Sequence, residues 1–509
     1  MVQKFGAFAL LLSFSSLVNA QNISERAFYA RCYSHLTGKP VPLGSPIMAQ
    51  VKAGTKKAIT ACNELLDKAE LEPNSGGLYV DNSESRAVLN NFASFHRSWF
   101  TANTVEQIQD NNNEISNGTM DIYDSTEPAL ALTRAMFVRN GRYSDVMTLG
   151  TGVQALRQEQ SMASKIGFDW SANYSGRRVH GNNPAFNNNQ FNFMPTAGPL
   201  ADVNNVFVAN FMKPMVGELY GIRQTVSDGT LVPNVAMQAF SDTRGNNQAG
   251  LNYSFNPHSS LGGGVLGSPI YLMMNFGHGK GTISNGSLKV PRRWAQTNMT
   301  TFMCATLPAL RESDVAQFVV GNSSAPFRNG TSCVMCHASL DPMAYTARNA
   351  VVVNTNFTTL ALPSRTSSLL TTFGENQASV AGWPSEPVAN FHRQTPTGKL
   401  YFRSFASGQL VNRDVLRISG LGAAIAEQDD YYQCAAKRYF EYFTGIQVSL
   451  YDRTDPKNAN LNKQLSEKSV ADRRYIEELG AELRQTQSVR GIIKKIMNSE
   501  YYHAANYRP

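Results

Sequence analysis

Two cysteines and one histidine form the most specific chemical pattern in this chain. Cys333 and Cys336 are separated by two residues and His337 follows directly, which gives the C-x-x-C-H pattern of covalent c-type haem attachment. Two thiols three positions apart can reach the two vinyl groups of one porphyrin, and the next residue can offer its imidazole to the iron. The pattern predicts one covalently bound haem c with His337 as the proximal iron ligand.

A zinc site and a thioredoxin-like redox pair are the alternatives for these three residues. Zinc would need a fourth ligand, and the sequence contains no second C-x-x-C and no H-x-x-x-H. A redox pair would need the strand-to-helix setting of a βαβ unit, whereas residues 329–332, Asn-Gly-Thr-Ser, are typical of a turn. Haem attachment is therefore the preferred interpretation.

The second axial ligand decides whether the iron serves electron transfer or binds a small ligand. No methionine lies between Met343 and Met497, so the downstream methionine that small cytochromes commonly use is missing. His392 is the first distal candidate, and a surface loop histidine is the alternative for that residue. Met343 would need a tight chain reversal just before it to reach the opposite face of the haem, and Met303 would have to come from the preceding segment.

The residues around Cys333 also carry a family resemblance. Residues 327–349, FRNGTSCVMCHASLDPMAYTARN, contain a Phe-Arg pair, the C-x-x-C-H pattern and an Asp-Pro pair in an order that recurs in planctomycete-type cytochrome c-like multidomain proteins. Further similar stretches are Ser268-Pro269, Arg292-Arg293-Trp294, Phe302-Met303-Cys304, CAAKRYFEYFTGI at 434–446 and NSEYYHAANY at 498–507. The resemblance covers about residues 260–509. It implies haem binding and the order of a middle domain, a haem segment and a C-terminal helical domain.

The N-terminus has the pattern of an export signal. One lysine precedes an apolar run from Phe5 to Val18, and Val18-Asn19-Ala20 supplies small residues for cleavage after Ala20. A single-span anchor is the alternative, but the run is shorter than the ~20 residues needed to cross a bilayer. The sequence predicts a cleaved signal peptide, a periplasmic or otherwise exported protein, and no transmembrane span in the mature chain.

The remaining four cysteines are candidates for disulfides in an oxidising compartment. Cys32 and Cys62 flank a break rich in glycine and proline at residues 38–46, which predicts a disulfide between two helices, with free buried thiols as the alternative. Cys304 could pair with Cys434, although sequence alone does not establish that connectivity.

Length and composition predict a globular protein of two to four domains. The chain has 509 residues, of which 42% are hydrophobic and 17% charged, so a hydrophobic core must supply its stability. We expect a mainly α fold with long irregular loops and an embedded cytochrome c-like haem-attachment segment. The expected parts are a signal peptide at 1–20, an N-terminal mainly helical domain at 21–180, a middle domain at 201–320, the haem segment at 321–415 and a C-terminal helical domain at 416–509.

Apolar spacing predicts three helices near the C-terminus. One spans Tyr431 to Thr444 and ends at Gly445. The others are amphipathic and carry apolar residues at helical spacing, namely Ile476, Leu479 and Leu483 in one and Val489, Ile493 and Ile496 in the next. Packing against a hydrophobic core explains these apolar helix faces.

Two further patterns bear on possible partners. Residues 262–267 match the G-x-G-x-x-G pattern, but no Asp or Glu occurs from Arg244 to Arg311, so we expect no dinucleotide site. The same stretch contains four basic residues, Lys280, Lys289, Arg292 and Arg293. They could lie near the haem propionates or contact an acidic partner, and the alternative is an ordinary solvated basic surface. The net charge of +8 comes without dense basic runs, so nucleic acid is not an expected partner.

These patterns favour a one-electron carrier. The predicted function is an exported monohaem c-type cytochrome-like protein that passes electrons through its covalent haem to a redox partner protein. The alternatives are a haem-dependent periplasmic oxidoreductase of the peroxidase type and a haem-stapled structural or binding protein of an envelope assembly. The sequence identifies neither a substrate nor an oligomeric state.

Overall fold

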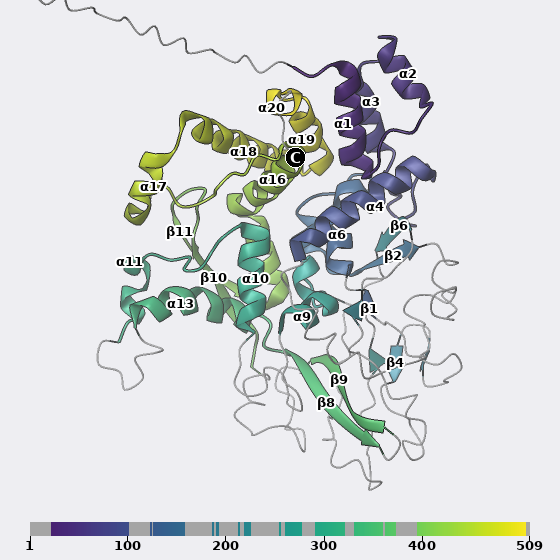
Figure 1. Ribbon diagram of the computed structural model, residues 1–509. Coiled ribbons are helices and arrows are strands. Elements are labelled where there is room, and N and C mark those ends of the chain that lie inside the picture. The colour runs from purple at the N-terminus through teal and green to yellow at the C-terminus, as the bar shows by residue number, and fades with distance from the viewer. Residues whose placement is uncertain are drawn as a thin grey trace, which may run out of the picture.

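Helices dominate the architecture (Figure 1). In the computed structural model, 59% of the described residues are helical and 11% lie in strands, which confirms the expectation of a mainly α protein. The description covers residues 22–100, 126–157, 218–224, 260–276, 291–320, 330–359, 362–372 and 394–504, and short strands at 123–124, 186–187, 190–192, 212–213 and 254–255.

The N-terminal part consists of packed helices whose ends follow from local sequence. They are α1 (Glu25–Thr37), α2 (Pro46–Lys52), α3 (Ala58–Asp67), α4 (Ser83–Arg97), the 3-10 turn η1 (Ser98–Phe100), α6 (Glu127–Phe137) and α7 (Asp145–Thr148). The hydroxyl of Ser24 accepts a hydrogen bond from the Ala27 N–H at 3.3 Å and caps α1. Gly38 ends that helix with φ of 68°, a conformation that suits glycine. The break at residues 38–46 thus separates α1 from α2, as its glycine and proline content predicts.

The middle part contains the helix that carries the C-x-x-C-H pattern and the helices that precede it in the chain. They are the 3-10 turn η4 (Gly264–Gly267), α9 (Pro269–Phe276), α10 (Arg292–Met303), α11 (Glu312–Val315), the 3-10 turn η5 (Ala316–Phe318) and α13 (Thr331–Tyr345). In Figure 1, α10 lies between α13 and α9, and it contacts both helices. Helix α10 therefore connects the C-x-x-C-H helix to α9.

The C-terminal part confirms the predicted helices. It comprises α15 (Arg417–Ala426), α16 (Asp429–Thr444), η6 (Pro456–Asn458), α17 (Ala459–Gln464), α18 (Glu467–Thr486), α19 (Val489–Met497) and α20 (Glu500–His503). Gly445 ends α16 with φ of 69°. The apolar stripes predicted for α18 and α19 are buried, which confirms packing as their role.

Strands form only small sheets in the described part. Antiparallel pairs are β2 (Val153–Arg157) with β6 (Leu219–Gln224), β8 (Ala350–Thr359) with β9 (Leu362–Thr372) and β10 (Thr397–Arg403) with β11 (Leu410–Leu416). Short pairings join β1 (Tyr123–Asp124) to β5 (Met212–Lys213), and β3 (Phe186–Asn187) to β4 (Gln190–Asn192) to β7 (Ser254–Phe255). The β8–β9 hairpin and all but the last residue of the β10–β11 hairpin lie within the predicted haem segment, for which the sequence analysis did not predict strands.

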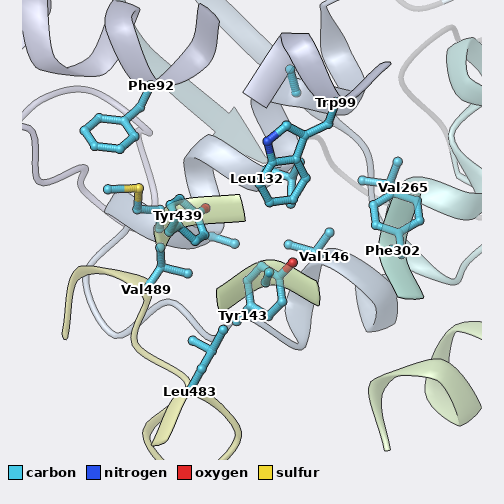
Figure 2. Packing of buried hydrophobic residues seen from close by; sticks show 14 of the residues in the cluster. Phe92, Trp99, Leu132, Tyr143, Val146, Val265, Phe302, Tyr439, Leu483 and Val489 are labelled. Carbon is cyan, nitrogen blue, oxygen red and sulfur yellow. The ribbon is translucent and has the colours of Figure 1, made fainter. Parts of the chain in front are cut away.

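One continuous hydrophobic core runs through the molecule. It includes Phe28 near the N-terminus, Leu132 and Trp294 in the middle and Tyr502 near the C-terminus. Figure 2 shows part of it, in which Trp99 and Tyr439 lie close to Leu132. Residues of the predicted N-terminal, middle, haem and C-terminal segments thus share one core.

Two disulfides cross-link this core, as the sequence analysis proposed. Cys32 of α1 is bonded to Cys62 of α3 with a Cα–Cα distance of 6.1 Å. Cys304, directly after α10, is bonded to Cys434 of α16 at 5.3 Å. The alternative of free buried thiols at Cys32 and Cys62 is therefore wrong.

The glycines at residues 262–267 have a packing role. Gly264 has φ of 58°, and a Cβ at this position would lie 2.0 Å from the Val146 carbonyl oxygen of α7. Its N–H donates to the Leu149 carbonyl at 2.8 Å. Close backbone approach explains the glycine here, because any larger residue would separate η4 from α7.

Within the described residues, no helix combines the length and the apolar character that crossing a bilayer requires. The two disulfides are compatible with export into an oxidising compartment. The predicted signal peptide lies outside the described residues.

Candidate haem-attachment site

Helix α13 brings the two thiols and the imidazole of the C-x-x-C-H pattern to one face. Cys333, Cys336 and His337 occupy positions i, i+3 and i+4 of this continuous helix. At 3.6 residues per turn, these positions fall within an arc of roughly 100°. The arrangement can present both sulfurs and the imidazole to one flat ligand that lies against the helix.

The intervening residues anchor the opposite side of α13. Val334 and Met335 are buried in a small hydrophobic cluster with Leu310, Val315 and Tyr401. Cys333 and Cys336 are free and half-buried. The two residues between the thiols therefore fix the orientation of the helix, and the thiols remain accessible.

The imidazole of His337 is oriented by a carboxylate one turn further along the helix. Its Nδ1 lies 3.3 Å from Oδ2 of Asp341. A carboxylate only accepts hydrogen bonds, so this contact favours the tautomer that carries its proton on Nδ1. Nε2 then keeps its lone pair for a metal, which is the common arrangement of histidines that bind iron or zinc.

Arg292 of α10 holds Asp341 in place. Its Nη2 donates to Oδ2 of Asp341 at 3.0 Å, and its Nε donates to Oδ1 of the same carboxylate. These hydrogen bonds raise the pKa of the Arg292 guanidinium. The result is a chain of contacts from Arg292 through Asp341 to His337 that links α10 to α13.

Close packing of β10 fixes the position of α13. A Cβ at Gly398 of β10 would lie 2.1 Å from the Pro342 carbonyl oxygen, so only glycine permits the observed approach. The phenol of Tyr401, also in β10, donates to the carbonyl of Asp314 at 2.7 Å. Strand β10 therefore supports α13 and also contributes to the cluster beneath its thiols.

Burial keeps the thiol of Cys336 protonated. Desolvation, together with the neighbouring Cys333, raises the pKa of the Cys336 thiol.

Of the distal ligand candidates, only Met343 and Met303 lie among the described residues, and neither is placed to reach the iron of a haem on this face. His392 lies outside the described residues. Met343 is fully buried in the main core, and α13 continues through residues 341–342 without the reversal that Met343 would need. Met303 is likewise fully buried, at the end of α10.

The donor set fits haem c better than it fits zinc. Two thiols, one imidazole with a free Nε2 and a carboxylate behind that imidazole are the protein groups that covalent haem requires. A structural zinc ion would need four protein ligands. Across the part of the chain that the structure describes, no group of three or more His, Cys, Asp and Glu residues is arranged to hold a metal ion.

Sequence reasoning missed the contact that orients His337. It placed Arg292 in a basic group with Arg293, Lys280 and Lys289 and did not pair it with a carboxylate. The only available signal was Asp341, which follows His337 by four positions and belongs to the Asp-Pro pair of the family resemblance. Lys280 and Lys289 lie outside the described residues.

The comparisons with known proteins give no relative for this chain. No protein-family model matches it, and neither does any curated protein or any solved structure. The functional argument therefore depends on the residues of α13 and their neighbours.

Proposed function

We propose that this chain is an exported monohaem c-type cytochrome-like protein that transfers one electron at a time. The observation that carries the proposal is the shared face of α13, where two free thiols lie beside an imidazole whose Nδ1 contacts Asp341. The haem would be attached through Cys333 and Cys336, with His337 as the proximal ligand. The family resemblance over about residues 260–509 supports the same assignment.

Attachment would use the thiols without changing their oxidation state. Each sulfur forms an S–C bond to one vinyl group, and the thiol hydrogen passes to the other vinyl carbon. The free and half-buried state of Cys333 and Cys336 suits this addition, whereas a disulfide between them would block it. When bound, the haem supplies a ferric/ferrous couple for one-electron transfer.

The chain's own residues would set the electronic environment of the iron. Asp341 makes the imidazole of His337 a stronger electron donor by accepting its Nδ1 proton in a hydrogen bond. Arg292 keeps that carboxylate aligned through two hydrogen bonds. This pair stabilises the ferric state and therefore lowers the reduction potential.

The compartment proposed for this function is the bacterial periplasm. Covalent haem attachment and disulfide formation both take place there, and the described chain contains two disulfides. A redox partner protein is the proposed exchange partner for the electron.

Haem staining of denaturing gels tests the proposal. The full chain is produced in a bacterial host with a working c-type haem maturation system, beside a Cys333→Ala/Cys336→Ala variant. Wild-type protein should stain and the variant should not. The matched control is Cys32→Ala/Cys62→Ala, which also replaces two cysteines but removes a disulfide, and it should retain the stain. An unstained wild type, or a stained Cys333→Ala/Cys336→Ala variant, would contradict the proposal.

A further inference from the structure

A second candidate site lies outside α13, in an open cleft between α4 and α16. The cleft has a volume of about 550 Å³, within the usual range for small-molecule sites. Its lining includes Asn91, Phe95, Trp99, Arg438 and Tyr442. None of these residues contributes to the proposed haem attachment.

One wall of the cleft is aromatic and rigid. The rings of Phe95 and Tyr442 lie 4.3 Å apart between centroids, and Trp99 meets Phe95 edge-on at 5.8 Å. The phenol of Tyr442 donates to the carbonyl of His35 at 2.8 Å, which fixes its ring. Trp99 is 7% exposed and anchored in the core (Figure 2). The wall is therefore preformed and suits a planar or apolar ring.

Of the two charged residues that line the cleft, Glu441 is the anion and Arg438 supplies the cationic guanidinium. Its Cζ lies 4.7 Å from the centroid of the Trp99 ring, and Nη2 donates to the carbonyl of Thr300 at 3.4 Å. Among the described residues Arg438 forms no ion pair, and its buried Nε has no hydrogen-bond partner. Burial lowers the pKa of this guanidinium, and the charge of Glu441 is among the influences that oppose this shift.

The nearby carboxylate does not neutralise Arg438 directly. Oε2 of Glu441 accepts from Nζ of Lys437 at 2.9 Å, and Oε1 accepts from the N–H of Val448 at 2.8 Å. Both oxygens of Glu441 are thus engaged elsewhere. Arg438 keeps N–H donors available, and the indole N–H of Trp99 also lacks an acceptor.

We propose that this cleft binds a small organic carboxylate that carries a ring. The carboxylate would accept hydrogen bonds from Arg438, since guanidinium and carboxylate geometries match in bidentate pairs. The ring would pack on Phe95 and Tyr442. Asn91 also lies in the lining, and its Nδ2 donates to the His35 carbonyl and the Tyr442 hydroxyl, which helps to fix this wall. Partial desolvation makes this ion pair stronger than one on an open surface.

Benzoate is the probe, titrated into the full-length wild-type protein and followed by isothermal calorimetry. We expect benzoate to bind at least tenfold more tightly than benzamide, which has the same ring without the charge, and than sulfate, which has charge without a ring. Arg438→Met should weaken benzoate binding by roughly 10- to 100-fold, the range expected for loss of a hydrogen bond to a charged group.

Two further variants test the proposal even if Arg438→Met disturbs the fold. Ser94→Phe changes an exposed residue of the cleft lining and should block benzoate by filling space. Arg139→Met removes a cation that stacks on Tyr79 at 3.8 Å but is paired with Glu70, so it should leave benzoate binding unchanged. Equal binding of benzoate and benzamide, equal binding of benzoate and sulfate, or unchanged binding in Ser94→Phe would overturn the proposal.

Discussion

The main core and helix α13 differ in how they use cysteine. In the core, Cys32 and Cys62 are fully buried and bonded to each other, and Cys434 is 1% exposed and bonded to Cys304. In α13, by contrast, both cysteines are free and half-buried. The comparison separates cysteines that hold the fold together from cysteines that are available for covalent chemistry.

The two regions also treat histidine differently. His96 is fully buried in the core, where Nδ1 lies 2.8 Å from the Thr133 hydroxyl and Nε2 lies 2.7 Å from the Tyr439 hydroxyl. Because the Thr133 hydroxyl donates to the Ala129 carbonyl, it accepts from Nδ1, and Tyr439 then donates to Nε2. Both nitrogens of His96 are thus engaged, whereas the contacts of His337 leave Nε2 available.

The largest expected effect comes from removing the long-range disulfide. Cys304 and Cys434 are 130 residues apart, so the bond restricts a large loop in the unfolded chain. Loop-entropy arithmetic gives about 5 kcal/mol of stabilisation for a loop of this size. The Cys304→Ala/Cys434→Ala variant should therefore unfold at a much lower denaturant concentration, as measured by circular dichroism.

The comparison predicts a much smaller effect in α13. Before haem attachment, Cys333→Ala/Cys336→Ala should change the free energy of unfolding by less than about 1 kcal/mol, because neither thiol is fully buried or bonded. Equal loss of stability in the two variants would contradict the division between structural and reactive cysteines.

A second effect is acid destabilisation through buried histidines. Burial lowers the pKa of His96 to about 3 and that of His35 to about 4, below the value near 6.5 in an unfolded chain. Between pH 6.5 and 4 the unfolded chain binds protons that the folded protein excludes, so stability falls as the pH falls. For His96 this amounts to about 3 kcal/mol at pH 4.5.

The variant His96→Gln isolates this contribution. It should be less stable than wild type at pH 7, because the Tyr439 hydrogen bond changes, but its stability should fall less between pH 7 and pH 4.5. Asp430 acts in the opposite direction in both proteins, since burial raises its pKa to about 6 and acidification removes the cost of its buried charge. An unchanged pH dependence in His96→Gln would show that His96 titrates normally.

A third and smaller effect concerns the orientation of His337. Asp341→Asn removes the carboxylate that accepts from Nδ1, so the imidazole becomes a weaker donor to the iron. The reduction potential of the haem-loaded protein should rise by roughly 60 mV, one tenfold change for a one-electron couple. Redox titration followed by absorption measures this shift.

Arg292→Met should shift the potential in the same direction by less, because the carboxylate itself remains. Arg293→Met is the matched control from the same helix turn and should leave the potential unchanged. A larger shift in Arg293→Met than in Asp341→Asn would show that general charge near the haem controls the potential and that His337 orientation does not.

The smallest expected effect is at Met343. Its side chain is fully buried in the main core, so Met343→Leu should leave the haem spectrum unchanged. His392→Ala, in contrast, should open the iron to carbon monoxide if His392 is the distal ligand. A haem spectrum that changes in Met343→Leu and not in His392→Ala would identify Met343, and not His392, as the distal ligand.

Much of the fold follows from the sequence because local patterns determine it. The apolar spacing of Ile476, Leu479 and Leu483 and the glycine at position 445 predict helices that the structure contains. The disulfide partners of Cys32 and Cys304 were also among the sequence-based hypotheses. Local periodicity restricts the helices strongly, and the positions of the cysteines restrict the possible disulfides.

The contacts that orient the candidate site could not be predicted in this way. Arg292 and Asp341 are separated by 49 positions, and their pairing depends on how α10 crosses α13. The helix continues through Pro342, where a local rule favours a break, because β10 packs closely there through Gly398. Tertiary contacts, which no single-sequence pattern encodes, decide both features.

The most direct test of the central claim is the mass of one tryptic peptide. Cleavage after Arg328 and Arg348 releases residues 329–348, which contain both thiols of α13 and His337. In protein purified from a host with c-type haem maturation, we predict that this peptide carries the mass of one haem and that peptides with the other four cysteines carry none. Recovery of the peptide with two free thiols, or with a Cys333–Cys336 disulfide and no haem, would contradict the account.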